Sequence, residues 1–435
     1  MDRTVASPRR LQGSLVLPGD KSISHRAALF NAIAHGTATV RNYATGADCA
    51  ATLSCLRALG VAVRRIEAGD GEGPGYAIAG GELHEPLDIL SAANSGTTMR
   101  LLAGTLAGHP FLSILTGDRS LRSRPMGRVV APLRLMGAQV QGRQGNTLAP
   151  LAIRGGGLKG IEYTMPVASA QLKSALLLAG LFAEGETVLH QPAASRDHTE
   201  RMLEAMGASV RCDGLTVAVR AGQLRPVDVT VPADISSAAF WLVAAVCHPQ
   251  ARIRVLGVGV NPTRAGILTA LRAMGARITL ENQRVQGGEP VADLVAESSD
   301  LVATEVDGDL IPLLIDEVPV LALAACFARG TTTVRDASEL RVKESDRLAT
   351  ITRELARLGA DVTELPDGLV VRGTGRLAGA TCRSHGDHRL AMMLGVAGLL
   401  ASGQTTVQGA QVASVSYPAF WEHLASVAQG SAGAP

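Results

Sequence analysis

The sequence predicts an α/β fold made of six repeated units, and three features of the chain support this prediction. An alanine-rich, apolar helix followed by a turn and a β-branched strand recurs about every seventy to eighty residues. Amphipathic helices that end at a glycine alternate with these segments. The composition, with 46% hydrophobic residues, 3% aromatic residues and 48 glycines, suits a closely packed interior of Ala, Leu and Val. Each unit is therefore expected to contain a strand, a buried helix, a strand, a surface helix and further strands.

The apolar helices are expected to be buried on most sides. Residues 27–34, for example, carry no charge, whereas a surface helix has a polar face. Pro18 and Gly19 form a turn before this first helix, and Ser22 or Ser24 is expected to cap its first amides. The six helix-to-strand segments span residues 27–40, 101–115, 175–188, 238–253, 320–334 and 394–407.

The amphipathic helices have a glycine directly after the last turn. A residue there often adopts the left-handed conformation, which glycine reaches without steric conflict. Leu348, Ile351, Leu355 and Leu358 keep helical spacing with charges between them, so these helices are expected to have one face in solvent. The five glycines are Gly60, Gly137, Gly207, Gly275 and Gly359.

Six units of this size exceed one core, so we expect two domains with three units in each. The boundary is placed at the polar segment 224–228, before the fourth unit. The first domain is then residues 19–228, and the second consists of residues 1–18 and 229–435. The short strand at residues 11–17 has no identifiable partner in the first unit and is expected to pair in the second domain.

Charge and cysteine usage exclude several classes of function. The net charge of +2 at pH 7 lacks the broad positive field of proteins that bind nucleic acids or membrane surfaces. No run of about twenty apolar residues occurs, and no apolar segment follows Arg9 and Arg10, so a cytoplasmic location is expected. The cysteines show neither a Cys-x-x-Cys pair nor histidines in metal spacing. We therefore expect reduced core thiols, no metal and no redox cofactor.

Lysine is rare in this chain. Of 41 basic residues only four are lysines: Lys21, Lys159, Lys173 and Lys343. Because arginine serves wherever a generic cation suffices, a lysine that persists suggests a need for a compact ammonium on a flexible stem. Lys21 and Lys343 both lie in polar segments near predicted helix starts, which makes them candidates for site residues.

The polar segments before the six buried helices are the predicted location of the chemistry. Helices that begin at the same end of their units direct six positive dipole ends toward a common region, which favours anions. Capping explains Ser, Thr or Asp there, but it does not explain Lys21, Arg26, Arg100, Gln171 or Arg389. The six segments are residues 21–26, 94–100, 169–173, 234–237, 316–319 and 386–389.

Cations outnumber acids among these candidates, which indicates a ligand with several negative groups. Asp316 and Glu344 are the acids. Carboxylates inside a cationic ring bind anions poorly, so they are expected to transfer protons or hold hydroxyls. Two other interpretations remain open here, an ordinary capped turn at residues 94–98 and a solvated charged helix face at 340–348. The cations are Lys21, Arg26, Arg124, Lys343, Arg347 and Arg389.

Five ordered motifs extend the argument from residues to a family. They are Leu17-Pro-Gly-Asp-Lys-Ser-Ile-Ser-His-Arg26, Asn94-Ser-Gly-Thr-Thr-Met-Arg100, Ser123-Arg-Pro-Met126, Leu340-Arg-Val-Lys-Glu-Ser-Asp-Arg347 and Asp387-His-Arg389. Together they resemble the signatures of the 5-enolpyruvylshikimate-3-phosphate synthase family, over residues 11–420. The resemblance implies an inside-out α/β barrel in each of two domains, with six βαβαββ repeats and an active site in the cleft between the domains. It also implies transfer of the enolpyruvyl group of phosphoenolpyruvate to the 5-hydroxyl of shikimate 3-phosphate, on the route to chorismate and aromatic amino acids.

The resemblance also implies roles for single residues. Asp316 corresponds to the candidate base for the attacking hydroxyl, Glu344 to the acid that protonates the methylene carbon, and Lys21 to a further catalytic residue. The residues implied for shikimate 3-phosphate are Lys21, Ser22, Arg26, Ser169, Gln171, Ser195, Arg196, Asp316 and Lys343. Those implied for phosphoenolpyruvate are Lys21, Gly96, Arg124, Gln171, Arg347 and Arg389.

The sequence departs from the commonest pattern of the family at three places, and the first two departures resemble the second class of these enzymes. Ala170 replaces a serine, His198 replaces an aromatic residue after Ser195-Arg-Asp, and residues 414–418 lack a lysine that the first class offers to phosphoenolpyruvate. Arg196 is then expected to take over a phosphate contact. Gly96 is the residue that the family associates with sensitivity to the inhibitor glyphosate, so inhibition by glyphosate is expected.

Two rival functions fit the sequence less well. The first is the related enolpyruvyl transferase that acts on UDP-N-acetylglucosamine, whose members usually carry a cysteine in the loop that corresponds to residues 117–127; this loop has none. The second is a non-catalytic scaffold that binds anions, which gives no reason for Lys21 and Lys343 to resist replacement by arginine. The expected partners are therefore two small-molecule substrates, without nucleic acid or membrane, and the chain is expected to be a monomer.

Overall fold

The computed structural model describes residues 1–67 and 73–429. By the contacts between residues, the chain forms two compact units. Unit 1 contains residues 1–18, 232–285 and 290–435, and unit 2 contains residues 19–231 and 286–289. The division falls after Val231, beyond the expected position at Asp228, because a short strand at residues 229–230 pairs with a strand of unit 2.

Unit 2 alternates strands and helices. Its strands are β3 (Gly36–Arg41), β4 (Ala62–Ile66), β5 (Gly75–Gly80), β6 (Leu90–Ser91), β7 (Leu112–Thr116), β8 (Gln139–Gly142), β9 (Leu148–Arg154), β10 (Glu162–Thr164), β11 (Glu186–His190), β12 (Val210–Asp213), β13 (Thr216–Arg220) and β14 (Val229–Thr230). Its helices are α1 (Lys21–Ile33), α2 (Ala47–Ala58), α3 (Gly96–Ala107), α4 (Gly127–Leu135), the short α5 (Arg143–Asn146), α6 (Ala170–Gly180) and α7 (His198–Ala205).

Unit 1 has the same alternation. Its strands are β1 (Arg3–Ala6), β2 (Leu11–Val16), β15 (Ala251–Gly259), β16 (Arg277–Gln286), β17 (Glu289–Glu297), β18 (Glu305–Val306), β19 (Thr331–Val334), β20 (Asp361–Leu365), β21 (Gly368–Arg372), β22 (Thr381–Arg383) and β23 (Gln404–Gln408). Its helices are α8 (Ile235–Cys247), α9 (Gly266–Ala273), α10 (Ile311–Leu314), α11 (Val318–Ala325), α12 (Arg347–Arg357), α13 (His388–Leu400) and α14 (Phe420–Gln429). The tip of the β16–β17 hairpin, residues 286–289, belongs to unit 2.

The sheets confirm the predicted repeat. In the sheet β6-β7-β9-β8, the first two strands are parallel because α3 connects them, and the last two form an antiparallel hairpin. The same order recurs in β10-β11-β13-β12, β14-β3-β5-β4 and β18-β19-β21-β20. The prediction that residues 11–17 pair in the second domain is confirmed: β2 lies parallel to β15 of unit 1. In its place, β14 completes the first repeat beside β3.

The sixth repeat departs from the expected βαβαββ pattern. Its sheet, β1-β23-β22, has three strands within the described residues. After β23 the chain continues into α14 rather than into a hairpin, and the N-terminal strand β1 pairs antiparallel with β23 instead. The edge that the missing hairpin would have covered is thus covered from the other end of the chain.

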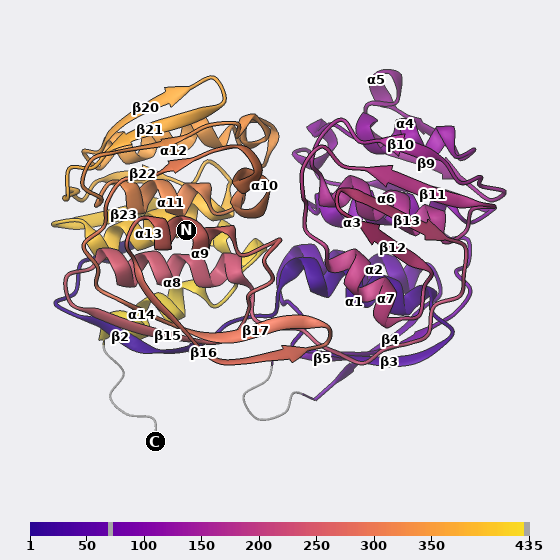
Figure 1. Cartoon of the computed structure of the whole chain (residues 1–435), viewed down its shortest axis with the longest axis horizontal. Helices are drawn as coiled ribbons and strands as arrows, with labels where there is room; N and C mark the ends of the chain where they lie inside the picture. The colour runs from indigo at the N-terminus through magenta and orange to yellow at the C-terminus, as the bar shows by residue number, and fades with distance from the viewer. Residues whose placement is uncertain (68–72, 430–435) are drawn as a thin grey trace. The chain divides into compact units, whose positions relative to one another are not determined.

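The apolar helices are buried in the middle of each unit, as predicted. Figure 1 shows α8, α11 and α13 gathered in unit 1, and α1, α3 and α6 in unit 2, with the strands on the outside. Trp241, Leu242 and Val243 of α8 are fully buried, as are Leu177 and Leu178 of α6. The five glycines predicted after the surface helices all have positive φ, between 81° and 106°. The predicted cap of α1 was wrong: Asp20, not Ser22 or Ser24, accepts the amide of Ile23.

Candidate active site

The starts of the three buried helices of unit 2 lie together. Ser95 caps α3 and Ser169 caps α6, each through a side-chain oxygen that accepts an amide of the first turn. The helices are joined beyond these caps, because Arg26 of α1 donates to Ser174 of α6, and Arg100 of α3 donates to Gln171 of α6. The free backbone amides and the positive dipole ends of α1, α3 and α6 therefore lie in one region of the unit, where they favour anions.

Lys21 is the first residue of α1, and its ammonium pairs with a carboxylate. The distance from Lys21 Nζ to Asp48 Oδ2 is 3.0 Å, and the lysine side chain keeps 21% of its exposure. Asp48 lies in the first turn of α2, so the pair joins two helix starts. A half-buried ammonium held this way has a fixed direction and remains able to contact an anion.

Gly96 lies beneath two guanidinium groups. A Cβ atom added at Gly96 would be 2.8 Å from Nη1 of Arg100 and 3.6 Å from Nη1 of Arg124. Arg124 Nη2 donates to Asn94 Oδ1 at 2.6 Å, and Arg100 Nη1 donates to Gln171 Oε1 at 2.5 Å. Gln171 in turn donates to Thr97 at 2.9 Å. The absence of a side chain at residue 96 thus leaves room for both guanidiniums beside the start of α3.

Arg26 is buried among hydroxyl groups. Its Nε donates to Thr199 and its Nη2 donates to Ser174, both at 2.7 Å, while its Nη1 donates to the carbonyl of Ser22 at 2.9 Å. Burial lowers the pKa of Arg26 to about 10, partly opposed by the charge of Glu200 and reinforced by that of Arg196. Arg196 is therefore near enough for its charge to act on Arg26.

A buried ion pair supports the segment that carries Ser195 and Arg196. Lys173 Nζ lies 2.6 Å from Glu200 Oε1 and donates to the carbonyl of Ser195 at 3.2 Å. The Ser195 hydroxyl donates to Gln191 at 2.6 Å. Lys173 was not predicted to have a role in the site, although it is one of only four lysines in the chain and this scarcity is a signal for it as well.

His25 joins three helix starts through a chain of hydroxyls. Its Nδ1 lies 2.7 Å from Thr52 Oγ1 of α2, and Thr52 lies 2.7 Å from Thr98 Oγ1 of α3. Thr98 in turn donates to the capping Ser95 Oγ at 2.8 Å. Burial lowers the pKa of His25 to about 3, so the imidazole is neutral in the folded chain at physiological pH. Its role is to hold the helix starts, not to carry a proton.

This pKa makes the stability dependent on pH in a definite direction. The unfolded chain binds a proton at His25 below its ordinary pKa of 6.5, whereas the folded chain stays neutral down to about 3. The contribution to stability is therefore complete above pH 6.5 and is lost as the pH falls toward 3. We expect His25→Gln to reduce the slope of unfolding free energy against pH by up to about 1.4 kcal/mol per pH unit between pH 5 and 6. Equal slopes in urea titrations of the two proteins would contradict this.

In unit 1 one buried arginine gathers three carboxylates. Arg347 Nε lies 2.8 Å from Asp387 Oδ2, its Nη2 lies 2.6 Å from Glu344 Oε2, and its Nη1 lies 3.5 Å from Asp316 Oδ1. Burial alone would lower the pKa of Arg347, but Asp387 and Glu344 raise it above its ordinary value. The same contact keeps the pKa of Asp387 low despite its burial. Arg347 is therefore charged, and it fixes the positions of both predicted catalytic acids.

Two further cations complete the cluster of unit 1. Arg389 Nη2 lies 3.7 Å from Asp316 Oδ2, and Arg389 follows Asp387, which caps α13. Lys343 is half-buried and has an extended backbone after the short 3-10 helix Ser338–Val342, four residues before α12. Burial lowers its pKa, while the carboxylates of Asp316 and Glu339 oppose that effect. Two cations and two acids thus face the same helix starts, with Arg347 between them.

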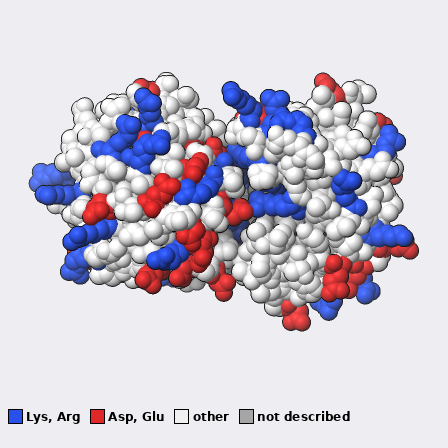
Figure 2. All heavy atoms as spheres, turned by 90° about the horizontal axis from the view of Figure 1, so that it is seen from above, with Lys and Arg blue, Asp and Glu red and all other residues white. Residues whose placement is uncertain are grey.

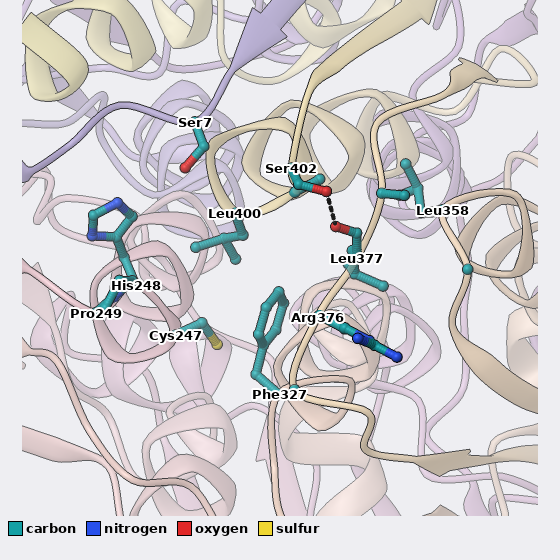
Figure 3. A pocket seen from close by; sticks show the side chains of 14 residues that line it. Ser7, Cys247, His248, Pro249, Phe327, Leu358, Arg376, Leu377, Leu400 and Ser402 are labelled. Carbon is teal, nitrogen blue, oxygen red and sulfur yellow. Dashed lines mark hydrogen bonds between the residues drawn. The ribbon is translucent and has the colours of Figure 1, made fainter.

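The charged groups of the site do not line the large cavity of unit 1. On the face shown in Figure 2, Lys and Arg are interspersed with Asp and Glu and form no continuous basic surface. A cavity of about 680 Å³ lies at the other ends of the buried helices, beside Cys247 of α8, Phe327 after α11 and Leu400 of α13 (Figure 3). No predicted site residue lines it, so it does not explain the charged helix starts.

The structure assembles the predicted residues as two groups, one in each unit. In unit 1, Arg347 contacts Asp316 and Glu344 directly, and Lys343 precedes Glu344 in the chain. Three further residues each hold a predicted cation. Asn94 and Asp387 lie within the predicted segments but had no assigned role, and Asp48 lies outside every predicted segment. The group in unit 2 is Lys21, Ser22, Arg26, Gly96, Arg124, Ser169, Gln171, Ser195 and Arg196, and the group in unit 1 is Asp316, Lys343, Glu344, Arg347 and Arg389.

Comparison with known proteins places nearly the whole chain in the family that the five sequence motifs resemble. The family model described as EPSP synthase (3-phosphoshikimate 1-carboxyvinyltransferase) matches residues 5–424. The 3-phosphoshikimate 1-carboxyvinyltransferase of Gloeobacter violaceus is 56% identical over 431 residues, which cover 98% of this chain and 99% of that protein. The protein of the same name from Roseiflexus castenholzii is 54% identical, with the same coverage. Among solved structures, EPSP synthase from Acinetobacter baumannii has a TM-score of 0.85 at 44% identity and covers 98% of both chains.

Proposed function

The chain belongs to the EPSP synthase family and catalyses transfer of the enolpyruvyl group of phosphoenolpyruvate to shikimate 3-phosphate, and we propose that its two groups of charged helix starts hold these substrates. One observation carries the proposal. In unit 1 the guanidinium of Arg347 contacts the carboxylates of both Glu344 and Asp316, so that a cation and two acids lie together. Such an arrangement suits a reaction that binds anions and moves protons.

Shikimate 3-phosphate is proposed to bind mainly through unit 2. Arg26 is assigned to its ring and carboxylate, and Arg196 lies near enough for its charge to lower the pKa of Arg26. The 3-phosphate is assigned to Ser169, Ser195 and Lys343, with Lys173 holding the segment of Ser195 in place. Ser22 and Gln171 contact the ring. Hydroxyl and guanidinium donors of this kind match phosphate and carboxylate oxygens.

Phosphoenolpyruvate is proposed to bind to the remaining cations. Unit 2 contributes Lys21, Arg124 and the backbone at Gly96, where no side chain stands in the way. Unit 1 contributes Arg347 and Arg389. The 5-hydroxyl adds to C2 of phosphoenolpyruvate as its proton passes to Asp316 and Glu344 gives a proton to C3. Loss of a proton from C3 and departure of phosphate then restore the double bond. Lys21 stabilises the charge of the departing phosphate.

The two units are proposed to be the two domains, with the active site in the cleft that forms as they close on the substrates. This proposal is supported by the distribution of the implied residues, because each unit alone lacks part of the set for either substrate. All implied residues come from one chain, which supports a monomer. The phosphorylated substrates and the cysteine usage support a cytoplasmic location. Within the described residues, no helix combines the length and apolar character that crossing a membrane requires.

Phosphate release tests the function itself. Phosphoenolpyruvate is offered with shikimate 3-phosphate in one assay and with UDP-N-acetylglucosamine in another. We expect release only with shikimate 3-phosphate. Release with the nucleotide sugar alone would instead support the related transferase, and release with neither acceptor would contradict the proposal.

Gly96→Ala tests the place assigned to phosphoenolpyruvate and to glyphosate, which is proposed to compete with it. The new methyl group meets Nη1 of Arg100 at 2.8 Å and approaches Arg124, so we expect a higher KM for phosphoenolpyruvate and weaker inhibition by glyphosate. The fold should be unaffected, because alanine favours a helix. Gly222→Ala is the matched control, since a Cβ there meets no atom within 4 Å. Unchanged inhibition at low phosphoenolpyruvate and saturating shikimate 3-phosphate would overturn the assignment.

A further inference from the structure

A closed ring of three polar side chains lies beneath the charged group of unit 1. Arg264 Nη1 donates to Glu317 Oε2 at 2.9 Å, and its Nη2 donates to the hydroxyl of Ser236. That hydroxyl donates to the other carboxylate oxygen, Oε1 of Glu317. All three residues are buried, and the Glu317 side chain has no exposed surface. The sequence motifs did not predict Arg264, which lies in the loop before α9.

The ring joins the starts of three buried helices. Ser236 is the second residue of α8, Glu317 directly precedes α11, and Arg389 is the second residue of α13. Arg389 Nη1 lies 3.5 Å from Glu317 Oε1, on the same oxygen that accepts the Ser236 hydroxyl. Arg389 therefore has its Nη1 near Glu317 and its Nη2 near Asp316, which directly precedes Glu317 in the chain.

Glu317 is not used as a helix cap, unlike the residues at the other buried helix starts. The side chains of Asp20, Ser95, Ser169, Asp234 and Asp387 each accept an amide of the following turn. The Glu317 side chain accepts none. Its two oxygens instead face Arg264 and Arg389. Helix capping therefore does not explain why a carboxylate is buried here.

Stability alone does not explain the ring either. Moving a guanidinium and a carboxylate out of water is unfavourable, and well-packed apolar residues in their place are often at least as stable. What an ion pair adds is direction, because each charged group can be satisfied in few positions. The direction matters most for Arg389, which otherwise would be drawn toward Asp316 alone.

We propose that the ring of Arg264, Ser236 and Glu317 is a positioning device for the reaction, in which Glu317 holds the Arg389 guanidinium beside Asp316 at a fixed spacing. This inference rests on the proposed function, which assigns Arg389 to phosphoenolpyruvate and Asp316 to proton transfer. Because Arg389 is also attracted to Glu317, it pairs less strongly with Asp316. The carboxylate of Asp316 is then available to accept the proton of the 5-hydroxyl. None of the three residues needs to touch a substrate.

The test removes both charges of the closest ion pair together, because removing one would leave the other buried without compensation. Asp234, which lies 3.7 Å from Arg264, still accepts the amide of Ser236 in this variant. The double variant Arg264→Met with Glu317→Met is expected to keep its melting temperature within a few degrees while kcat/KM for phosphoenolpyruvate falls about 10- to 100-fold. The affinity for glyphosate at saturating shikimate 3-phosphate, measured by calorimetry, should fall as well. The matched control is Arg252→Met with Glu297→Met, an exposed pair of unit 1 at 3.8 Å, which should leave these values unchanged.

Two further variants keep the test decisive. If the double variant does not fold, Ser236→Ala removes the bridging hydroxyl with both charges kept, and it should still weaken glyphosate binding. Arg264→Lys keeps the charge and should recover part of the loss. Wild-type binding and kcat in the folded double variant, or in Ser236→Ala, would overturn the inference. Arg389→Gln separates the two proposals: if that change leaves KM for phosphoenolpyruvate unaltered, the proposed role of Arg389 fails, and if it alone impairs binding, only the ring fails.

Discussion

Replacing Asp316 by asparagine is expected to lower kcat by about 10²- to 10⁴-fold, which is the usual contribution of a positioned general base. The fold should tolerate the change, since Arg347 keeps its contacts of 2.8 Å with Asp387 and 2.6 Å with Glu344. Substrate affinity should change little, because the amide still hydrogen-bonds a hydroxyl. Single-turnover rates and binding by calorimetry measure the two effects separately. Glu344→Gln is expected to behave in the same way.

The matched control for this prediction is Asp309→Asn, an exposed aspartate of the same unit. It should leave kcat and KM as they are. Loss of substrate binding in Asp316→Asn, with the rate of bound substrate unaffected, would show that Asp316 serves binding and not proton transfer.

Replacing Arg347 by methionine is expected to have the largest combined effect on stability and activity. The change leaves three carboxylates near one another, of which Asp387 is fully buried and loses its main charged partner, while Asp316 and Glu344 are partly exposed. Breaking a buried ion pair in this way costs about 3–5 kcal/mol of unfolding free energy. Activity should fall below detection, because Arg347 is also assigned to phosphoenolpyruvate. Urea unfolding and phosphate release measure the two losses.

The same helix supplies the control for Arg347. Arg353 is exposed on α12, and Arg353→Met should change the unfolding free energy by no more than about 0.5 kcal/mol. If Arg347→Met is as stable as Arg353→Met, the three-carboxylate cluster does not depend on this arginine.

The fold was largely predictable because its elements are specified by local patterns. Uncharged apolar segments such as residues 27–34 fold as buried helices, and glycine after a surface helix marks its end. The exchange of β2 and β14 was only half predictable, since a strand of two residues leaves almost no pattern. The pairing of the N-terminal strand β1 with β23 in the sixth repeat was not predictable either, because contact between the two ends of the chain depends on tertiary structure.

Site residues could be predicted where the residue type is unusual for its position. They could not be predicted where the residue type is common there. Lys21 and Lys343 are conspicuous because the chain avoids lysine, and arginines at helix starts exceed what capping needs. Thr199 and Ser174 are ordinary residues, yet they hold Arg26. Arg264 lies outside every motif that was recognised, in a chain that is rich in arginine. Its burial is a property of the folded structure, which no local pattern records.

A crystal structure of the chain with shikimate 3-phosphate and glyphosate tests the central claim most directly. We predict that the 3-phosphate lies within about 3 Å of Ser169, Ser195 and Lys343, and that glyphosate lies within the same distance of Lys21, Arg124 and Arg389. Ligands bound elsewhere, with Lys21 and Lys343 both beyond hydrogen-bond reach, would contradict the assignment of the charged helix starts to the two substrates.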